Sequence, residues 1–350
     1  MSYPTASATP QRVLYDFRSD TVTRPTPAML AAMAAAEVGD DVWGDDYTVQ
    51  ALEAETAELT GFEAGLFLPS GTQSNLVALM THCQRGDEYL VGQLAHCYRW
   101  EGGGAAVLGS IQPQPLEHAA DGSLPLDQLE AAIKPDDPHF ARTRLLALEN
   151  TIGGKVLPPA YVADALALAR RHGLATHLDG ARLWNAAAAL GVAPAEVARG
   201  FDSVSLCLSK GLGAPVGSVL VGRKDFLSQA RRWRKMLGGG MRQAGLLAEA
   251  GRHALRHHLP RIGEDHVNAR LLAEGLSRFA ALTVAPVQTN MLFVSVDPAI
   301  AADFAVYLRQ QGVLISGVAQ QRWVTHLDVD AAAIAATLRL VEAFFDPAKR

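Results

Sequence analysis

The stretch SVSLCLSKGLGAPVGS, residues 203–218, decides the fold class. It begins with an apolar run and continues into a loop in which Gly211, Gly213 and Gly217 follow Lys210. A short run that is apolar on both faces predicts a strand covered on both sides, as in a parallel sheet. The stretch therefore predicts a buried strand that ends just before a lysine and a glycine-rich loop.

Other short apolar runs repeat this pattern through the first two thirds of the chain. They occupy residues 64–68, 88–92, 144–149, 174–179 and 218–222. Between two of them, residues 158–173 predict a helix, because Pro159 stands near its start and Gly173 follows its end. Strands that alternate with amphipathic helices predict a three-layer α/β/α domain around a mainly parallel sheet. We expect this large domain to cover residues 14–250.

The pattern changes in the C-terminal part of the chain. Helical stretches at 243–259 and 266–279 precede several short strands and a final helix from about Asp330. Fewer and shorter elements predict a smaller α+β domain, which we expect over residues 251–350. Helices are expected near 27–37 and 48–60, and the N-terminal segment is expected to contribute partly to the smaller domain.

Composition excludes several classes of protein. The chain has 350 residues, is 49% hydrophobic and carries a net charge of −5 with mixed signs, so neither a nucleic-acid surface nor a membrane surface is implied. No apolar run approaches the roughly 20 residues of a membrane helix, and residues 1–12 do not resemble a secretory signal. Three cysteines, an odd number, favour a reducing cytoplasm over a disulfide framework.

Lys210 has two interpretations. Burial lowers the pKa of an amine, which then becomes a neutral nucleophile able to form a Schiff base. The alternative is an ordinary surface lysine just past a strand end. A dinucleotide fingerprint is excluded because GLGAPVG is not GxGxxG and Pro215 would break the following helix. A P-loop is excluded because its lysine follows the glycines.

Asp179 also ends an apolar strand. A carboxylate there can keep a pyridine-ring nitrogen protonated, which makes the ring a better electron sink. The alternatives are a helix N-cap or a salt bridge with Arg182. Ligands bind at the carboxyl ends of strands in open α/β sheets. Asp179 and Lys210, thirty-one residues apart at two successive strand ends, therefore favour a ligand site together.

If the ligand is pyridoxal phosphate, whose pyridine ring these two residues would hold, a phosphate site should also exist. PSGTQSN, residues 69–75, is the candidate. Glycine and small hydroxyl residues at a helix start offer backbone N–H groups to a dianion, and Ser70 or Thr72 could add a hydroxyl. An ordinary capped helix start would look the same.

Two histidines stand out among the eleven. His96 follows another strand, where it could stack on a cofactor ring or take a proton, whereas His139 lies on a polar loop before a strand. The pairs His82–Cys83 and His96–Cys97 lack tight ligand spacing, so we expect no metal site.

Eight motifs carry a resemblance that covers the chain from about Asp16 to the final helix. They are DFRSDTVTRPTPAM, VGDDVWGDD, LPSGTQSNLVAL, GGAAVLGSIQPQP, ALEN, HLDGAR, LSKGLGAPVGS and RWRKMLGGGMRQ. In this order they resemble the threonine aldolases of pyridoxal phosphate fold type I, closest to the low-specificity bacterial type. The resemblance implies pyridoxal phosphate, a homotetramer with interface active sites, and retro-aldol cleavage of L-threonine, L-allo-threonine and other β-hydroxy-α-amino acids to glycine and an aldehyde.

The resemblance also assigns roles to residues of this chain. Lys210 matches the Schiff-base lysine, Asp179 the partner of the ring nitrogen, and His96 the ring-stacking histidine. His139 matches a second histidine near the substrate hydroxyl, so the proton acceptor is either His96 or His139. The phosphate loop matches Gly71 and Thr72, the substrate carboxylate site matches Ser19, Arg182 and Arg322, and basic positions that could serve a neighbouring subunit match Lys235 and Arg242.

The chain departs from the family pattern at two positions. Trp43 replaces a frequent tyrosine, and Ile152 stands where many members have histidine, so the preference for the substrate side chain is open. Within the cofactor class, an aminotransferase or a β-eliminating lyase is the alternative function. A non-catalytic protein that keeps the fold and the ligand is the alternative outside it.

Overall fold

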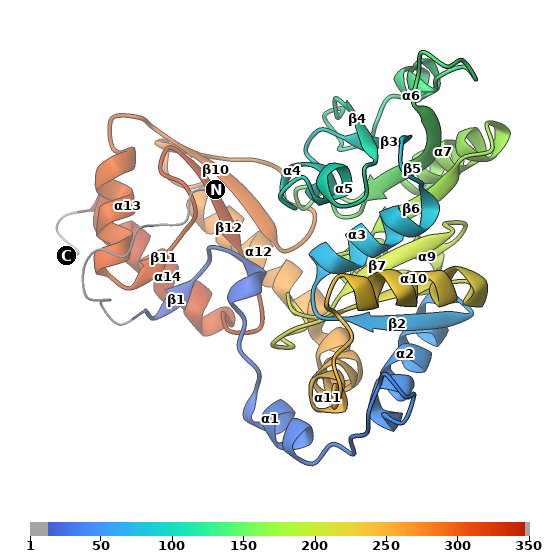
Figure 1. The fold of residues 1–350 in the computed structure, drawn as a ribbon. Coiled ribbons are helices and arrows are strands. Elements are labelled where there is room, and N and C mark those ends of the chain that lie inside the picture. Colours follow the sequence, from blue (N-terminus) through green and yellow to red (C-terminus); the bar gives the residue numbers. More distant parts are fainter. Residues whose placement is uncertain (1–12, 347–350) are drawn as a thin grey trace. The chain divides into compact units, whose positions relative to one another are not determined.

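The computed structural model describes residues 13–346, which form two compact units (Figure 1). The larger unit is Thr23–Gly263, and the smaller unit comprises the described residues up to Val22 and from Glu264 onwards. From the sequence we expected the boundary between the two domains after residue 250. That position lies inside a helix, α11 (Gly245–His253), whose Ala248 and Ala250 belong to the core of the larger unit.

A seven-stranded sheet forms the centre of the larger unit, with the strand order β2-β8-β7-β6-β5-β3-β4. The strands are β2 (Ala64–Leu68), β3 (Asp87–Gly92), β4 (Gln112–Leu116), β5 (Arg142–Glu149), β6 (Ala175–Asp179), β7 (Ser203–Cys207) and β8 (Ser218–Gly222). The strands from β7 to β4 pair in parallel, as the sequence predicted.

Strand β8 is antiparallel to both of its neighbours, β2 and β7. The loop 208–217 that joins β7 to β8 is too short for the crossover of a dozen or more residues that a parallel connection needs. The glycine loop after Lys210 therefore turns the chain back beside the strand that it left.

Helices cover both faces of this sheet, which confirms the three-layer α/β/α prediction (Figure 1). Alternate residues of one strand join different cores: Phe67 packs with α2 and α11, whereas Leu66 and Leu68 pack with α3 and α10. The helices are α1 (Pro27–Ala34), α2 (Tyr47–Thr60), α3 (Gly71–His82), α4 (His96–Arg99), α5 (Gly104–Val107), α6 (Leu126–Ala132), α7 (Pro159–Arg171), α8 (Leu183–Leu190), α9 (Pro194–Ala198), α10 (Lys224–Met236) and α11.

Strand β4 was not expected, because its sequence QPQPL contains Pro113 and Pro115. Proline cannot donate to a neighbouring strand and is therefore confined to sheet edges. β4 lies at the edge beside β3, where only one side of the strand needs donors.

The smaller unit has its own core, with Phe17, Leu292, Phe304 and Trp323 fully buried. A two-stranded parallel ribbon joins the N-terminal segment to this unit by pairing β1 with β11. Its elements are β1 (Tyr15–Asp16), a 3-10 turn (Asp20–Val22), α12 (Ile262–Leu276, which begins at the boundary), β9 (Leu282–Val284), β10 (Met291–Val296), α13 (Ala301–Gln310), β11 (Val313–Leu314), β12 (Gln320–Val324) and α14 (Ala331–Phe345).

Candidate active site

Four neighbouring strands of the larger unit end at one edge of the sheet. Lys210 follows β7, Asp179 ends β6, Glu149 ends β5, and His96 follows β3. Asp179 and Glu149 stand directly opposite each other in the register of β5 and β6. The edge that the sequence predicted thus collects an amine, two carboxylates and an imidazole.

The loop that carries Lys210 is held by its backbone. The Lys210 carbonyl accepts hydrogen bonds from the Thr23 hydroxyl at 2.9 Å and from the Gly213 N–H at 2.8 Å. Gly217 has a φ of +106°, and a Cβ there would lie 2.5 Å from the Phe67 ring, so this turn requires glycine. Lys210 itself is half-buried rather than buried as expected, because β7 already ends at Cys207.

Asp179 is 2% exposed, and each oxygen of its carboxylate accepts one hydrogen bond. Its Oδ1 accepts from the Ala181 N–H at 3.0 Å, and its Oδ2 accepts from Asn75 Nδ2 at 2.8 Å. Neither a helix cap nor an ion pair with Arg182 accounts for these contacts. The carboxylate is held in place at the strand end by two neutral donors.

His96 is oriented by a second carboxylate, that of Glu101. The distance from His96 Nδ1 to Glu101 Oε1 is 2.8 Å, and Asn75 Nδ2 donates to the same oxygen at 2.8 Å. The hydrogen bond to Glu101 raises the pKa of His96, and burial raises the pKa of Glu101. With Nδ1 engaged as a donor, Nε2 remains for a reacting group.

Glu149 contacts the same histidine through the backbone. Its Oε2 accepts from the His96 N–H at 2.7 Å. Loss of solvent around the carboxyl, and then the nearby charge of Asp179, raise the pKa of Glu149 to about 7. The charge of Lys210 acts in the opposite direction on Glu149 and also lowers the pKa of His96, so these four groups lie within electrostatic reach of one another.

Sequence reasoning did not assign Glu101, Glu149, Asn75 or His177 to the site. Signals existed for three of them: Asn75 closes the PSGTQSN motif, and Glu149 belongs to ALEN at a strand end. His177 precedes Asp179 by two residues and therefore shares its face of the strand.

The start of α3 offers an anion site. Ser70 is the N-cap, and its hydroxyl accepts from the Gln73 N–H at 3.1 Å, so this oxygen closes the helix start. Gly71 and Thr72 occupy the first turn, where N–H groups have no partner in the helix. Behind Gly71 lies the buried Ser218 hydroxyl, 3.5 Å from where a Cβ would stand, without a hydrogen-bond partner in the described chain.

One group of side chains in the described residues has the spacing of a metal site: His96, Glu101 and Asp179 each offer an atom within 4.8 Å of the others. Asn75 donates to both carboxylates and His96 to one of them. Hydrogen bonds thus account for their spacing. The pairs His82–Cys83 and His96–Cys97 form no such group, and all three cysteines are free and buried.

His139 lies at the opposite end of the sheet. It precedes β5 by three residues, so it stands at the amino end of that strand, and its side chain is 84% exposed and paired with Asp137 at 2.6 Å. Within one chain the structure does not bring His139 to Lys210, Asp179 or His96. A residue before a parallel strand faces the edge away from the ligand site, and this position in the sequence already indicated it.

Three basic residues that the resemblance assigned to the site lie in different segments of the larger unit. Arg182 is half-buried and directly precedes α8, three residues after Asp179. Lys235 is exposed in the last turn of α10, and the exposed Arg242 pairs with Asp40 at 3.0 Å. None of the contacts described for Lys235 and Arg242 joins them to the groups at the sheet edge.

Ser19 and Arg322 belong to the smaller unit. Arg322, on β12, donates from Nη2 to the Arg18 carbonyl at 2.9 Å, and Arg18 precedes Ser19. The Ser19 hydroxyl accepts from the Thr21 N–H at 3.2 Å. These two predicted carboxylate ligands are therefore neighbours within their own unit.

The two departures from the family pattern differ in burial. Trp43 is 81% exposed on a turn, whereas Ile152 is buried in the core of the larger unit. A Cβ on Gly122 would lie 2.3 Å from Ile152, so this side chain packs against that turn.

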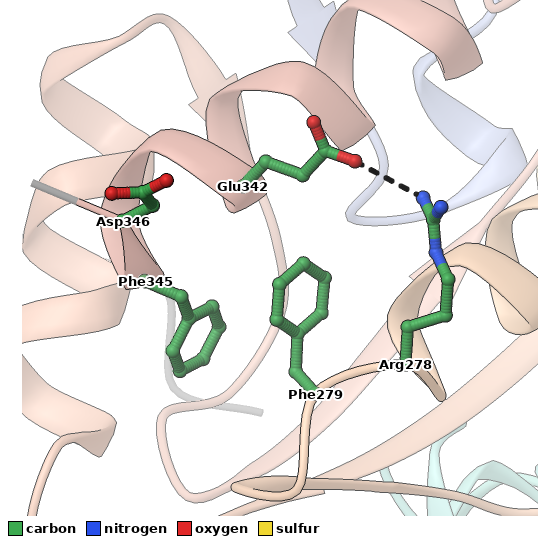
Figure 2. A pocket seen from close by; sticks show the side chains of 5 residues that line it. All are labelled: Arg278, Phe279, Glu342, Phe345 and Asp346. Atoms are coloured by element: carbon green, nitrogen blue, oxygen red, sulfur yellow. Dashed lines mark hydrogen bonds and ion pairs between the residues drawn. The ribbon is translucent and has the colours of Figure 1, made fainter. Parts of the chain in front are cut away.

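The smaller unit also has a hollow of its own, about 330 Å³ in volume (Figure 2). Phe279 and Phe345 stack with ring centroids 4.6 Å apart, and Arg278 pairs with Glu342 at 3.2 Å beside them. Only an exposed ion pair and two packed rings line it, together with Asp346. It has none of the residues that were assigned to the site.

Among the described helices, none has the length and the apolar character that crossing a membrane requires.

Comparison with known proteins gives one consistent result. The family described as beta-eliminating lyase matches residues 16–299. The chain is 58% identical over 316 residues to the low-specificity L-threonine aldolase of Escherichia coli (strain K12), which covers 90% of this chain and 95% of the relative. It is 48% identical over 292 residues to the low-specificity L-threonine aldolase 1 of Arabidopsis thaliana, covering 81% of each.

Among solved structures, the threonine aldolase of Leishmania major superposes with a TM-score of 0.81 at 23% identity, over 95% of this chain and 98% of that one. That likeness supports the fold, and the relatives at higher identity support the family. The chain therefore belongs to the threonine aldolases of the beta-eliminating lyase family.

Proposed function

We propose that this chain is a pyridoxal-phosphate-dependent threonine aldolase. It cleaves the Cα–Cβ bond of L-threonine, L-allo-threonine and other β-hydroxy-α-amino acids to give glycine and an aldehyde. The observation that carries the proposal is the sheet edge where Lys210, Asp179 and His96 follow three strands of one parallel sheet, in a chain 58% identical to an enzyme of that name.

The residues fit pyridoxal phosphate at three points. The open first turn of α3 and the unpartnered Ser218 hydroxyl suit its phosphate. The Asp179 carboxylate, held by two neutral donors, suits a protonated ring nitrogen. The amine of Lys210 suits its aldehyde carbon. When bound, the cofactor supplies an electron sink for the bond that breaks.

His96 is the histidine that this geometry favours as proton acceptor. Glu101 holds Nδ1, which leaves Nε2 to take the proton of the substrate β-hydroxyl. His139 is at the other end of the sheet and is dropped as a candidate within one chain. Stacking of His96 on the cofactor ring, implied by the resemblance, is a separate role that substitution by phenylalanine would preserve.

The substrate carboxylate is assigned to Arg182, Ser19 and Arg322 by the resemblance, since a guanidinium can bind a carboxylate with two parallel hydrogen bonds. Lys235 and Arg242 remain candidates for contacts with a neighbouring subunit of a homotetramer. We also infer a cytoplasmic location, from the odd number of cysteines. Each of these assignments is a prediction.

The decisive experiment measures aldehyde and glycine released from the four threonine stereoisomers, with and without added pyridoxal phosphate. Cofactor-dependent release from the L-isomers is expected, and Lys210→Ala should abolish both the bound-cofactor absorbance and nearly all cleavage. Thr176→Val serves as a control, because it removes a buried hydroxyl on the same sheet that bonds Asp202 instead of the site.

Other outcomes would assign the alternatives. Alanine formation from added pyruvate would indicate an aminotransferase, and ammonia with a keto acid would indicate β-elimination. Cofactor bound to Lys210 without turnover of any β-hydroxy amino acid would indicate a binding protein. A Lys210→Ala protein with full activity would overturn the proposal.

A further inference from the structure

A chain of buried hydrogen bonds continues from the site into the core of the larger unit. Asn75, on α3, places Nδ2 2.8 Å from Asp179 Oδ2 and 2.8 Å from Glu101 Oε1. Its other atom, Oδ1, lies 3.2 Å from Nε2 of His177 on β6. Asn75 and His177 are 2% and 0% exposed. One amide thus joins the carboxylate beside the ring nitrogen to the carboxylate that orients His96.

The side chains of Ser203 and His82 continue this series of hydrogen bonds. His177 Nδ1 lies 2.8 Å from the hydroxyl of Ser203, the first residue of β7. The same hydroxyl lies 2.7 Å from Nε2 of His82 at the end of α3. The relay, defined as Asn75, His177, Ser203 and His82, therefore ties α3, β6 and β7 together behind the site.

The orientation of the Asn75 amide favours one set of hydrogen-bond directions along the relay. Asn75 turns its NH₂ group toward oxygens of both carboxylates and therefore its own oxygen toward His177. The oxygen needs a donor, which makes His177 Nε2 protonated. With His177 neutral, Nδ1 accepts from the Ser203 hydroxyl, whose oxygen then accepts from His82 Nε2–H.

Neutral imidazoles agree with their surroundings. Burial lowers the pKa of His177 to about 4, and burial together with the charge of His177 lowers the pKa of His82 to about 3. Both rings are therefore uncharged at neutral pH, as the hydrogen-bond directions require.

We propose that His177 and Ser203 are positioning residues that orient the Asn75 amide, and that this one amide sets both Asp179 and Glu101 for the reaction. The proposal rests on the proposed function, because it assigns Asp179 to the ring nitrogen and Glu101 to the proton acceptor. A flipped amide would bring Oδ1 against two carboxylates and its NH₂ against the His177 N–H. It would lose two hydrogen bonds to charged acceptors in a buried place.

The test compares two variants of one position. His177→Gln can return an N–H donor near the position of Nε2, whereas His177→Leu fills the space without any donor. Thr176→Val is the matched control, since Thr176 is the neighbouring buried residue of β6 and bonds Asp202, outside the relay. Each protein is measured for pyridoxal phosphate affinity, for kcat and KM, and for the pH dependence of kcat/KM.

His177→Leu should weaken pyridoxal phosphate binding about tenfold or more, on the scale of one lost hydrogen bond to a charged group. It should lower kcat more than it raises KM, and His177→Gln should recover most of both losses. The Thr176→Val control should stay close to wild type in each. Equal cofactor affinity and kcat in the leucine and glutamine variants would overturn the proposal.

A second measurement needs neither activity nor cofactor. Imidazole ¹⁵N NMR of the cofactor-free full chain should show His177 neutral and protonated at Nε2 at pH 7. Ser203→Ala, a smaller change that tests the relay if His177→Leu does not fold, should let part of the population shift to the Nδ1 tautomer. A wild-type His177 protonated at Nδ1 or doubly protonated would overturn the proposal.

The two proposals fail differently. A wild-type protein that neither binds pyridoxal phosphate nor cleaves β-hydroxy amino acids would overturn the function, while the His177 tautomer would still report on the relay. An active wild type with the wrong tautomer would overturn the relay alone.

Discussion

Two histidine–carboxylate pairs of nearly equal length lie at opposite ends of the same sheet. His96 and Glu101 are 2.8 Å apart with side chains 42% and 4% exposed. His139 and Asp137 are 2.6 Å apart with side chains 84% and 45% exposed. Both pairs join an imidazole to a carboxylate at a similar distance, so burial is what separates the two pairs.

That difference changes the chemistry of each acid. Burial raises the pKa of Glu101, and hydrogen bonds from His96 and Asn75 together with the charge of His96 oppose the effect. Asp137 is exposed to solvent, and hydrogen bonds from His139 lower its pKa. The buried pair is connected to Asp179 through Asn75, whereas the exposed pair is a local contact between residues two apart in sequence. Such exposed pairs contribute little.

The largest expected effect separates the two histidines. His96→Ala should lower kcat/KM by about 10²-fold, the scale of general base catalysis, whereas His139→Ala should stay within about threefold of wild type. Steady-state cleavage of L-threonine measures both. Full activity in His96→Phe would leave stacking as the only role of His96, and an equal loss in both alanine variants would erase the distinction between the pairs.

A smaller effect concerns pH. The hydrogen bond to Glu101 raises the pKa of His96, and only the neutral ring can accept a proton, so kcat/KM should rise with pH through that pKa. Glu101→Gln removes the negative partner and should move this limb to lower pH. Asp137→Asn is the control and should leave the limb in place. A profile unchanged in Glu101→Gln would show that His96 does not set it.

The third prediction concerns Glu149, the other carboxylate on His96. Its pKa is raised from the ordinary 4.5 to about 7 in the folded protein, so between these two pH values the folded state binds more protons than the unfolded one. Folding stability from this group is therefore full below that window and is lost as pH rises through it.

Glu149→Gln removes this loss. The difference in melting temperature, variant minus wild type, should be larger at pH 8 than at pH 5. Scanning calorimetry at both pH values measures it. A difference that is constant across this range would show that Glu149 titrates normally.

The smallest effect belongs to the exposed pair. Asp137→Asn should leave the melting temperature and kcat/KM within experimental error, because water solvates both partners when the contact is lost. The melting temperatures of both proteins should respond equally to ionic strength, and a clear loss of stability in Asp137→Asn would contradict this prediction.

Much of the fold and part of the site followed from local patterns. The apolar runs at 64–68 and 218–222 became β2 and β8 within the predicted bounds, and Pro159 and Gly173 did bound α7. Lys210, Asp179 and His96 could be recognised because each follows an apolar strand. Glu101 carried no such signal, and the signals of Asn75 and His177 gain meaning only through contacts between α3, β6 and the segment after β3.

The sequence by itself determined the mainly parallel sheet and the family and predicted the edge of the ligand site, since periodicity and strand–loop order are local properties of the chain. Tertiary structure decided which polar groups at that edge are shielded from water. It made Glu101 part of the site and left Asp137 outside it, although both lie beside a histidine. The physical reason is that a carboxylate's pKa and its hydrogen-bond partners depend on solvent exclusion, which arises only when distant segments pack together.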